Sequence, residues 1–190
     1  MAKLSSQNLT LEIRYKNFQA GDVQYEIGFL WENESMINDA LLKRWSDYWR
    51  SRRKGYFLAN EYEKDRLIGT IEKALQIDEP AYWKSLDPDL IFAIYPKKCF
   101  PFFEPCEEWI GEDDEAKSEQ ANQEKRPDGW FTVIAFIDAY NFQNCKGYSD
   151  SGIALHLLVA RKDVESFCAS LKEEYAEFKQ KYKVDEYKPE

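Results

Sequence analysis

The stretch LTLEIRYKNFQAGDVQYEIGFLW, residues 9–31, decides the fold of this chain. Its first seven residues place Leu9, Leu11, Ile13 and Tyr15 on one face and Thr10, Glu12 and Arg14 on the other. After the turn-rich segment NFQAGD, the alternation resumes with Val23, Tyr25, Ile27, Phe29 and Trp31. A period of two is typical of a strand that is buried on one side. The stretch therefore predicts an antiparallel pair of half-buried strands.

Residues 38–54 carry apolar side chains at the three-to-four spacing of a helix. Asn38 or Asp39 would cap its start, and Gly55 fits the position just past its end, where the chain needs a positive φ. The inward stripe would consist of Leu41, Leu42, Trp45, Tyr48 and Trp49. The outward side chains would include Lys43, Asp47, Arg50 and Lys54.

The rest of the chain contains further helical and strand-like patterns. A second helix is expected from about Asn60 to Gln76, with Leu67, Ile68, Ile71 and Leu75 on its buried face. Three apolar segments are typical of strands: DPDLIFAIYP at 87–96, WFTVIAFIDAY at 130–140 and SGIALHLLVA at 151–160. A last helix is expected from about Arg161 to Tyr182, and its apolar face consists of Val164, Phe167, Cys168, Leu171, Tyr175 and Phe178.

The predicted order of elements is β-β-α-α-β-loop-β-β-α, which is typical of an α+β fold. We expect about five strands in a mainly antiparallel sheet, with the helices packed on one face. A length of 190 residues fits a single domain spanning 1–190. Residues 107–129 are mostly polar and acidic, and they predict a mobile acidic loop inside this domain. The tail after residue 184 is expected to fray.

The bulk composition indicates a globular protein with no membrane partner. Hydrophobic residues make up 44% of the chain, aromatic residues 16% and charged residues 32%. No apolar run approaches the roughly 20 residues that a membrane-spanning helix needs. The start MAKLSSQNLTLEIRY lacks the apolar segment of a secretory signal. The four cysteines lack CxxC spacing, so we expect reduced thiols in the cytoplasm: Cys99, Cys106, Cys145 and Cys168.

The residue types that carry chemistry form no recognisable catalytic or cofactor motif in the sequence, so we expect no enzyme, no cofactor and no metal site. The single histidine, His156, lies in a strand pattern, and the glycines form no phosphate-binding loop. The densest acidic run, Glu112, Asp113, Asp114 and Glu115, lies in the predicted loop, where a solvated charge run is the simpler interpretation. Asp138, at a strand end, is better placed but stands alone. A metal-dependent enzyme that uses carboxylates stays open as an alternative.

The net charge of -9 argues against general affinity for nucleic acid, but the charge is unevenly distributed. From Lys43 to Lys54 there are six basic residues and one acidic residue. The basic side chains at the end of the predicted helix are Arg50, Arg52, Arg53 and Lys54. They would neutralise the protein's own acidic loop or simply be solvated, contact a protein partner, or serve as a nucleic-acid-associated module. Helical spacing predicts that the neighbouring Trp45 and Trp49 belong to the core.

Three segments, in this order along the chain, resemble bacterial immunity proteins of contact-dependent and polymorphic toxin systems, particularly of the wall-associated-toxin type. The first is YEIGFLWE, from Tyr25 to Glu32, a second strand that ends in a tryptophan. The second is NEYEKDRLIGTIEKAL, a helix introduced by acidic residues. The third is IALHLLVARKDVESFCASLKEEYAEF, a strand that leads into an amphipathic helix. The resemblance covers the order of elements, and the tryptophan-rich helix and the long acidic loop depart from it.

The resemblance implies a small α+β protein that binds a cognate toxin or enzyme and neutralises it without catalysis. A basic toxin or nuclease domain would be attracted to an acidic protein of this kind. The partner-binding residues would be Glu112, Asp113, Asp114 and Glu115 in the loop and Arg50, Arg52, Arg53 and Lys54 at the helix end.

Overall fold

The computed structural model of the chain describes residues 1–19, 21–42, 53–61, 66–85, 90–96, 129–143 and 151–184. The strands within these ranges are Ala2–Ser6 (β1), Leu9–Gln19 (β2), Asp22–Trp31 (β3), Glu34–Ser35 (β4), Tyr56–Glu61 (β5), Ala81–Lys84 (β6), Leu90–Pro96 (β7), Trp130–Asp138 (β8) and Gly152–Ala160 (β9). The same ranges contain the helices Arg66–Ile77 (α1) and Arg161–Tyr182 (α3) and the short 3-10 helix Ala139–Asn141 (η2). The predicted α+β class is confirmed.

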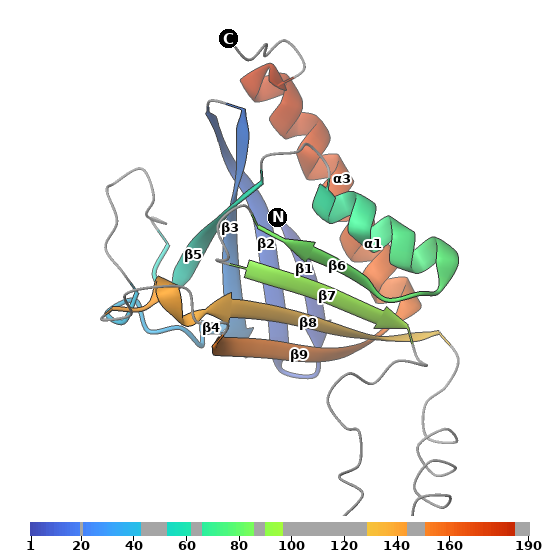
Figure 1. Cartoon of the computed structure of the whole chain (residues 1–190), viewed down its shortest axis with the longest axis horizontal. Coiled ribbons are helices and arrows are strands. Elements are labelled where there is room, and N and C mark those ends of the chain that lie inside the picture. Colours follow the sequence, from blue (N-terminus) through green and yellow to red (C-terminus); the bar gives the residue numbers. More distant parts are fainter. Residues whose placement is uncertain are drawn as a thin grey trace, which may run out of the picture.

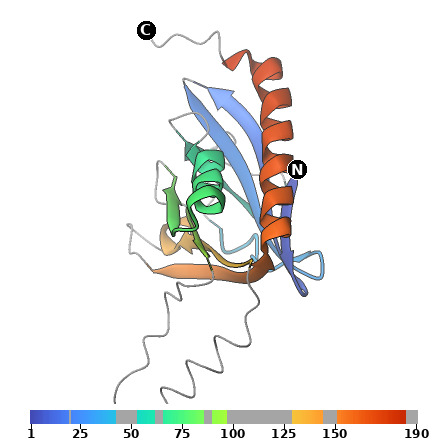
Figure 2. The ribbon, with the colours of Figure 1, turned by 90° about the vertical axis from the view of Figure 1, so that its right-hand side faces the viewer.

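The strands form two antiparallel sheets, where the sequence predicted one. The first sheet has the order β1-β2-β3-β4, and β5 also pairs with β3; the second has the order β6-β7-β8-β9. The strands of the two sheets cross steeply in Figure 1, and α1 and α3 lie together at the right-hand side of that view. Figure 2 faces this side and shows the two helices next to each other. The prediction missed β1, β4, β5 and β6, which are short strands with little room for a periodic pattern.

The predicted hairpin is confirmed as β2 and β3, which pair from Leu9 opposite Trp31 to Gln19 opposite Asp22. A bulge between Tyr15 and Asn17 interrupts the register. Two details differ from the prediction. The face expected to be solvated carries the buried carboxylate side chains of Glu12 and Glu26, and Trp31, expected on the buried face, is 51% exposed.

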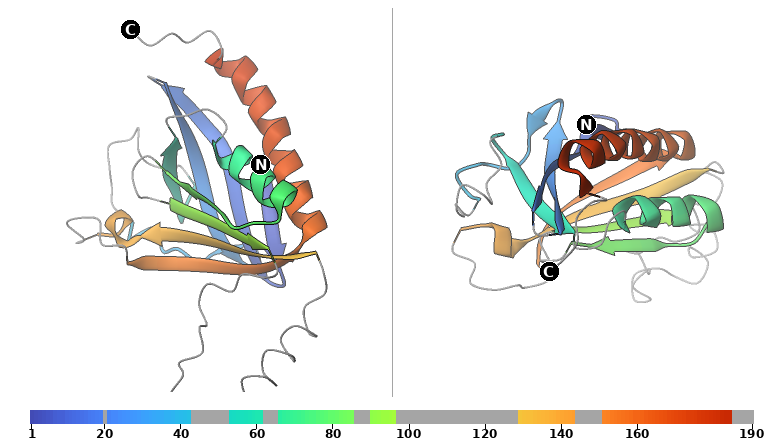
Figure 3. Two further views of the ribbon diagram at one scale, coloured as in Figure 1. Left: turned by 45° about the vertical axis from the view of Figure 1, so that its right-hand side comes forward. Right: turned by 90° about the horizontal axis from the view of Figure 1, so that it is seen from above.

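One hydrophobic core joins both sheets and both helices. Its largest fully buried side chains include Phe29 from β3, Phe92 from β7, Phe131 from β8 and Phe167 from α3. The apolar face predicted for the last helix is confirmed residue by residue, since Val164, Phe167, Cys168, Leu171, Tyr175 and Phe178 are all buried. The views in Figure 3 show α3 running along the first sheet, where the rings of Tyr175 and Phe178 pack against Tyr15.

The helix predicted for residues 38–54 is wrong at both described ends. Residues 38–42 form turns and an isolated bridge from Leu42 to Phe142, and residues 53–55 form a bend and a turn. The main-chain N–H of Gln143 donates to the carbonyl of Leu41 at 2.8 Å, so a tertiary contact takes the acceptor that a helix would use. Leu41, expected inside, is 55% exposed. The positive φ predicted for Gly55 is confirmed at 72°, while Trp45 and Trp49 lie outside the described residues.

The second predicted helix starts later than expected, because residues up to Glu61 belong to β5. Asn60, the expected start, pairs with Gln24 of β3. The helix α1 begins at Arg66, where the carboxylate of Glu61 accepts hydrogen bonds from the N–H groups of Arg66 and Leu67. Its buried face holds Leu67, Ile68 and Ile71 as predicted, with Ala74 fully buried in place of Leu75. The predicted loop at 107–128 and the tail after 184 lie outside the described residues.

Candidate functional site

The face of the first sheet that points away from the core is unusually polar and unusually buried. Glu12 and Glu26 are 2% and 1% exposed, and Gln24 and Asn60 are each 2% exposed. Glu26 forms an ion pair with Arg14 on the neighbouring strand. Buried charges in proteins are stabilised only when they are paired and hydrogen-bonded.

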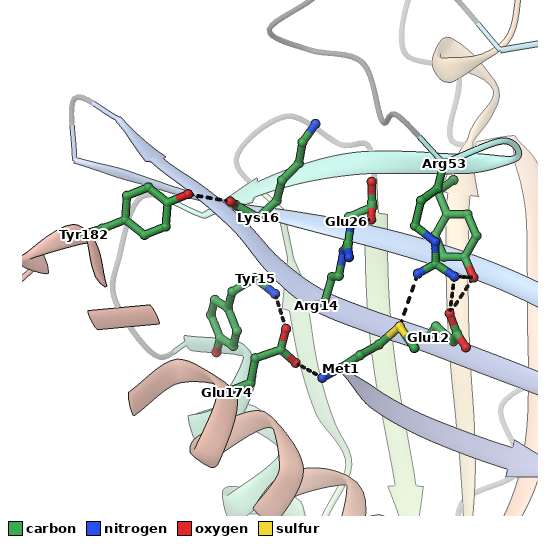
Figure 4. Close-up of polar contacts among 10 residues, drawn as sticks. Met1, Glu12, Arg14, Tyr15, Lys16, Glu26, Arg53, Glu174 and Tyr182 are labelled. Carbon is green, nitrogen blue, oxygen red and sulfur yellow. Dashed lines mark hydrogen bonds and ion pairs between the residues drawn. The ribbon is translucent and has the colours of Figure 1, made fainter. Parts of the chain in front are cut away.

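Glu12 is the centre of an ion-pair network on this face (Figure 4). Lys3 Nζ lies 2.6 Å from its Oε1, Arg53 Nη2 lies 3.2 Å from its Oε2, and the Tyr56 hydroxyl donates to Oε2 at 2.5 Å. The guanidinium of Arg53 also lies 3.7 Å from the centroid of the Tyr56 ring. Burial alone would raise the pKa of Glu12, but the hydrogen bonds from Lys3 and Tyr56 and the charges of Lys3 and Arg53 outweigh it and lower the pKa. Burial and the bond to Glu12 raise the pKa of Tyr56.

The lowered pKa makes Glu12 a source of acid sensitivity. A folded-state pKa below the unfolded value contributes stability above the ordinary carboxyl pKa, and this contribution is lost as the pH falls through the folded value. We expect Glu12→Gln to lose about 2 kcal/mol of unfolding free energy at neutral pH, since it removes charge-assisted hydrogen bonds. The difference from wild type should shrink between pH 5 and pH 3 in urea titrations, roughly the range of carboxyl protonation. Glu34→Gln, on exposed β4, is the control; a difference that stays constant with pH would contradict the assignment.

Glu61 is a second buried carboxylate, and it lies where β5, β6 and α1 meet. Besides the two helix N–H groups, it accepts hydrogen bonds from the Tyr25 hydroxyl at 3.0 Å and from Trp83 Nε1 at 2.7 Å. Burial raises the pKa of Glu61, although these donors act in the opposite direction. A surface cavity of about 520 Å³ adjoins it, lined among others by Arg66 and Lys84. The four donors and the position at the helix start indicate a structural carboxylate.

The other candidates for chemistry also have structural surroundings. Asp138 is 1% exposed, and its Oδ1 accepts from the N–H of Tyr140 at 2.7 Å, which caps η2. His156 lies on β9, within the segment predicted to be a strand, and is exposed. Cys168 is a free, buried thiol whose pKa is raised by burial. These positions do not bring a nucleophile, a base and an acid together among the residues that the structure describes.

The residues predicted to bind a partner are only partly within the described ranges. Arg53 is directed inward to Glu12 and Tyr56 of the first sheet, whereas the acidic run that it was predicted to neutralise lies outside the described residues. Lys54 is exposed. Arg50 and Arg52, and the acidic run Glu112, Asp113, Asp114 and Glu115, lie outside the described residues.

A pair of large apolar side chains is exposed where β3 meets β4. Trp31 is 51% exposed and Met36 is 47% exposed. Trp31 pairs with Glu34, and the N–H of Met36 donates to the carbonyl of Phe29, so Trp31 and Met36 lie on adjacent chain segments. Leu9, half-buried, lies opposite Trp31 on β2. We call Leu9, Trp31 and Met36 the apolar rim.

Among the described residues, no group of three or more His, Cys, Asp or Glu side chains is arranged to hold a metal ion. Over the same residues, no helix has both the length and the apolar character needed to cross a membrane.

Comparison of the chain with protein-family models, with curated proteins and with solved structures gives no match. The resemblance to immunity proteins therefore stays a prediction. The interpretation of the site rests on its own geometry.

Sequence reasoning missed the buried face around Glu12 and the capping role of Glu61. The alternation of residues 9–15 assigns Glu12 to the solvated side of a strand. The helical pattern places Glu61 within the second predicted helix. The sequence signalled only that the strand ends at Trp31, because Glu32 and Asn33 follow it directly. Both adopt positive φ in the turn to β4, and they mark the end of the strand.

Proposed function

We propose that this chain is a non-catalytic, protein-binding protein, an inhibitor of the immunity type that binds and neutralises a partner toxin or enzyme. The apolar rim is the observation that carries this proposal. An exposed Trp next to an exposed Met is typical of the anchors of protein interfaces, where Trp, Met and Tyr are enriched. Glu12, Glu61 and Asp138 each accept hydrogen bonds from groups of the protein itself, which is in keeping with a structural role for these buried acids.

The net negative charge of the chain favours a basic partner. With a net charge of -9, the protein repels acidic surfaces and attracts basic ones, such as the substrate groove of a nuclease. Complementary charge speeds association and suppresses wrong partners more than it raises affinity. The apolar rim would then supply the short-range contact with the partner. The net negative charge would speed the approach of a basic partner.

The proposal is tested by a tagged pull-down from a lysate of the organism that encodes the chain, with mass spectrometry of the eluate. The identified partner is then made recombinantly, and its own activity is measured with increasing amounts of this chain. We expect inhibition that is complete at an equimolar ratio. A partner whose activity is unaffected, or the absence of any stoichiometric partner, would overturn the proposal.

Removing the anchor should weaken this complex strongly. We expect Trp31→Ala to raise the Kd about 30-fold, corresponding to the roughly 2 kcal/mol of an interface anchor. Ile77→Ala is the matched control, because Ile77 is 45% exposed and ends α1, a helix that lies on the other side of the molecule from β4 in Figure 1. Isothermal titration calorimetry measures both variants. Equal losses in the two variants would argue against the apolar rim as the contact.

A further inference from the structure

Among the strands that the structure describes, β9 borders the second sheet and is an edge strand without the usual protection. It pairs with β8 along all nine residues, without a register shift, and it is the outermost strand in Figure 1. Its sequence, GIALHLLVA, contains no Lys, Arg, Asp, Glu or Pro. Natural edge strands are usually blunted by charges, by Pro, by bulges or by being short, because an open row of main-chain groups is a template for another strand.

Each of the other outer strands of the two sheets is short or carries a charge: β4 has two residues, and β5 has six residues and ends in Glu61. β6, at the opposite border of the second sheet, has four residues and ends in Lys84. β1, at the border of the first sheet, has five residues and carries Lys3. β9 is therefore the exception, being both long and uncharged.

The register shows which main-chain groups of β9 face outward. The N–H of Ala139 donates to the carbonyl of Ser151 at 2.6 Å, and the N–H of Arg161 donates to the carbonyl of Gly129 at 2.5 Å. Hydrogen-bonded pairs alternate along an antiparallel ladder, so the odd-numbered residues of β9 bond to β8. The even-numbered residues direct their N–H and C=O groups away from the sheet. Gly152 and Ala154 are two of these even-numbered residues.

Near the C-terminal end of β9, a contact with β1 limits the open edge. The hydroxyl of Ser6 donates to the carbonyl of Leu158 at 2.7 Å, so the outward carbonyl of Leu158 is already used. The part of the edge that begins at Gly152 includes Ala154. Its surroundings are apolar, because Ile153 is 42% exposed and Leu158 is 37% exposed. A short extended segment fits this length, and a long strand does not.

We propose that the partner protein adds an extended, uncharged strand to the edge of β9 at Gly152 and Ala154 and so continues the second sheet. The inference rests on the proposed function and names its mode of binding. Strand addition uses main-chain hydrogen bonds for affinity and side-chain contacts for specificity. A basic partner is the occupant, since a second copy would bring another charge of -9 to the same place.

The test uses Ala154→Pro in the full chain. Proline removes the outward N–H of residue 154 and leaves the bonds between β8 and β9 intact, because this N–H is not part of the ladder. Gly152 is left unchanged, because a Cβ there would lie 1.8 Å from the carbonyl oxygen of Ile137. Ala154→Thr, which keeps the N–H and has high strand propensity, is the matched control.

The probe is the partner identified and produced as described above. We expect Ala154→Pro to raise its Kd by about 10- to 100-fold, as fits the loss of a main-chain bond together with steric exclusion, and Ala154→Thr to change it less than about 3-fold. Circular dichroism and the Tm show whether each variant is folded. If Ala154→Pro does not fold, hydrogen exchange of the wild-type chain decides, since the amides of Gly152 and Ala154 should become protected in the complex.

The outcomes separate this inference from the proposed function. A partner that binds and is inhibited, with unchanged affinity for Ala154→Pro and unprotected amides at Gly152 and Ala154, overturns the role of β9 alone. The absence of an inhibited partner overturns the function. Light scattering that shows a dimer of the chain alone, which Ala154→Pro disrupts, would make a second copy the occupant and overturn the choice of a partner protein.

Discussion

Replacing Glu61 by Ala should destabilise the protein by about 3 kcal/mol, the largest effect that we expect from a single side chain. The substitution leaves four donors without an acceptor: the N–H groups of Arg66 and Leu67, the Tyr25 hydroxyl and the Trp83 indole. Each buried donor without a partner costs about 1–3 kcal/mol, and local relaxation recovers part of the sum. Urea unfolding followed by tryptophan fluorescence measures the change.

The pH dependence of this effect should have the opposite sign to that of Glu12. The pKa of Glu61 is raised by burial, so its contribution is full below the ordinary carboxyl pKa and declines as the pH rises through the folded value. The difference between wild type and Glu61→Ala should therefore be larger at pH 4 than at pH 8.

Glu165→Ala is the matched control for Glu61, because the side chain of Glu165 on α3 is 54% exposed and lies 3.8 Å from Arg161. We expect a change within about 0.5 kcal/mol for this surface carboxylate. A loss below about 1 kcal/mol for Glu61→Ala would show that Glu61 does not organise the start of α1, since a helix cap alone is worth about that much.

Replacing Gly28 by Ala should cost about 2–3 kcal/mol through overpacking. A Cβ at this position would lie 2.3 Å from Cε1 and 2.6 Å from Cζ of the Tyr56 ring. The ring cannot move away cheaply, because its hydroxyl donates to Glu12 and accepts from Arg53 at 2.6 Å. The collision is therefore transmitted to the whole ion-pair network.

A double-mutant cycle with Tyr56→Ala tests this explanation. Without the ring the clash is absent, and Ala has the higher strand propensity, so Gly28→Ala in that background should be neutral or slightly stabilising. Equal losses in both backgrounds would mean that the backbone at Gly28, and not the Tyr56 ring, is the constraint. Thermal unfolding of the four proteins completes the cycle.

Local patterns predicted the elements that are long and amphipathic. The period of two in residues 9–31 became β2 and β3, and all six residues of the predicted stripe on α3 are buried. These predictions hold because a long element with one apolar face has few alternatives that bury the same side chains. The apolar segments of β7, β8 and β9 were located for the same reason.

The errors arise where distant contacts compete with local preference. The carbonyl of Leu41 is taken by Gln143, about a hundred residues away, so the predicted helix does not start there. Asn60 looked like a helix start, but pairing with β3 extends β5 to Glu61. The carboxylate of Glu61 then caps a helix that begins at Arg66.

The candidate sites depended on tertiary structure even more strongly. Glu12 is more than forty residues away from both Arg53 and Tyr56 in the sequence, so the sequence does not show that the three meet on one sheet face. The sequence of β9 shows that it has no charge, yet only the sheet order shows that it is an edge.

By itself, the sequence determined the α+β class, the central hairpin, the amphipathic last helix and the acidic balance of the chain. These are properties of spacing and composition, which act over a few residues or over the whole chain. Only the tertiary structure decided that there are two sheets, that Glu12 and Glu61 are buried, and that Trp31 and the edge of β9 are exposed. The physical reason is that burial, hydrogen bonding and exposure depend on what packs across from a residue, and those neighbours come from distant parts of the chain.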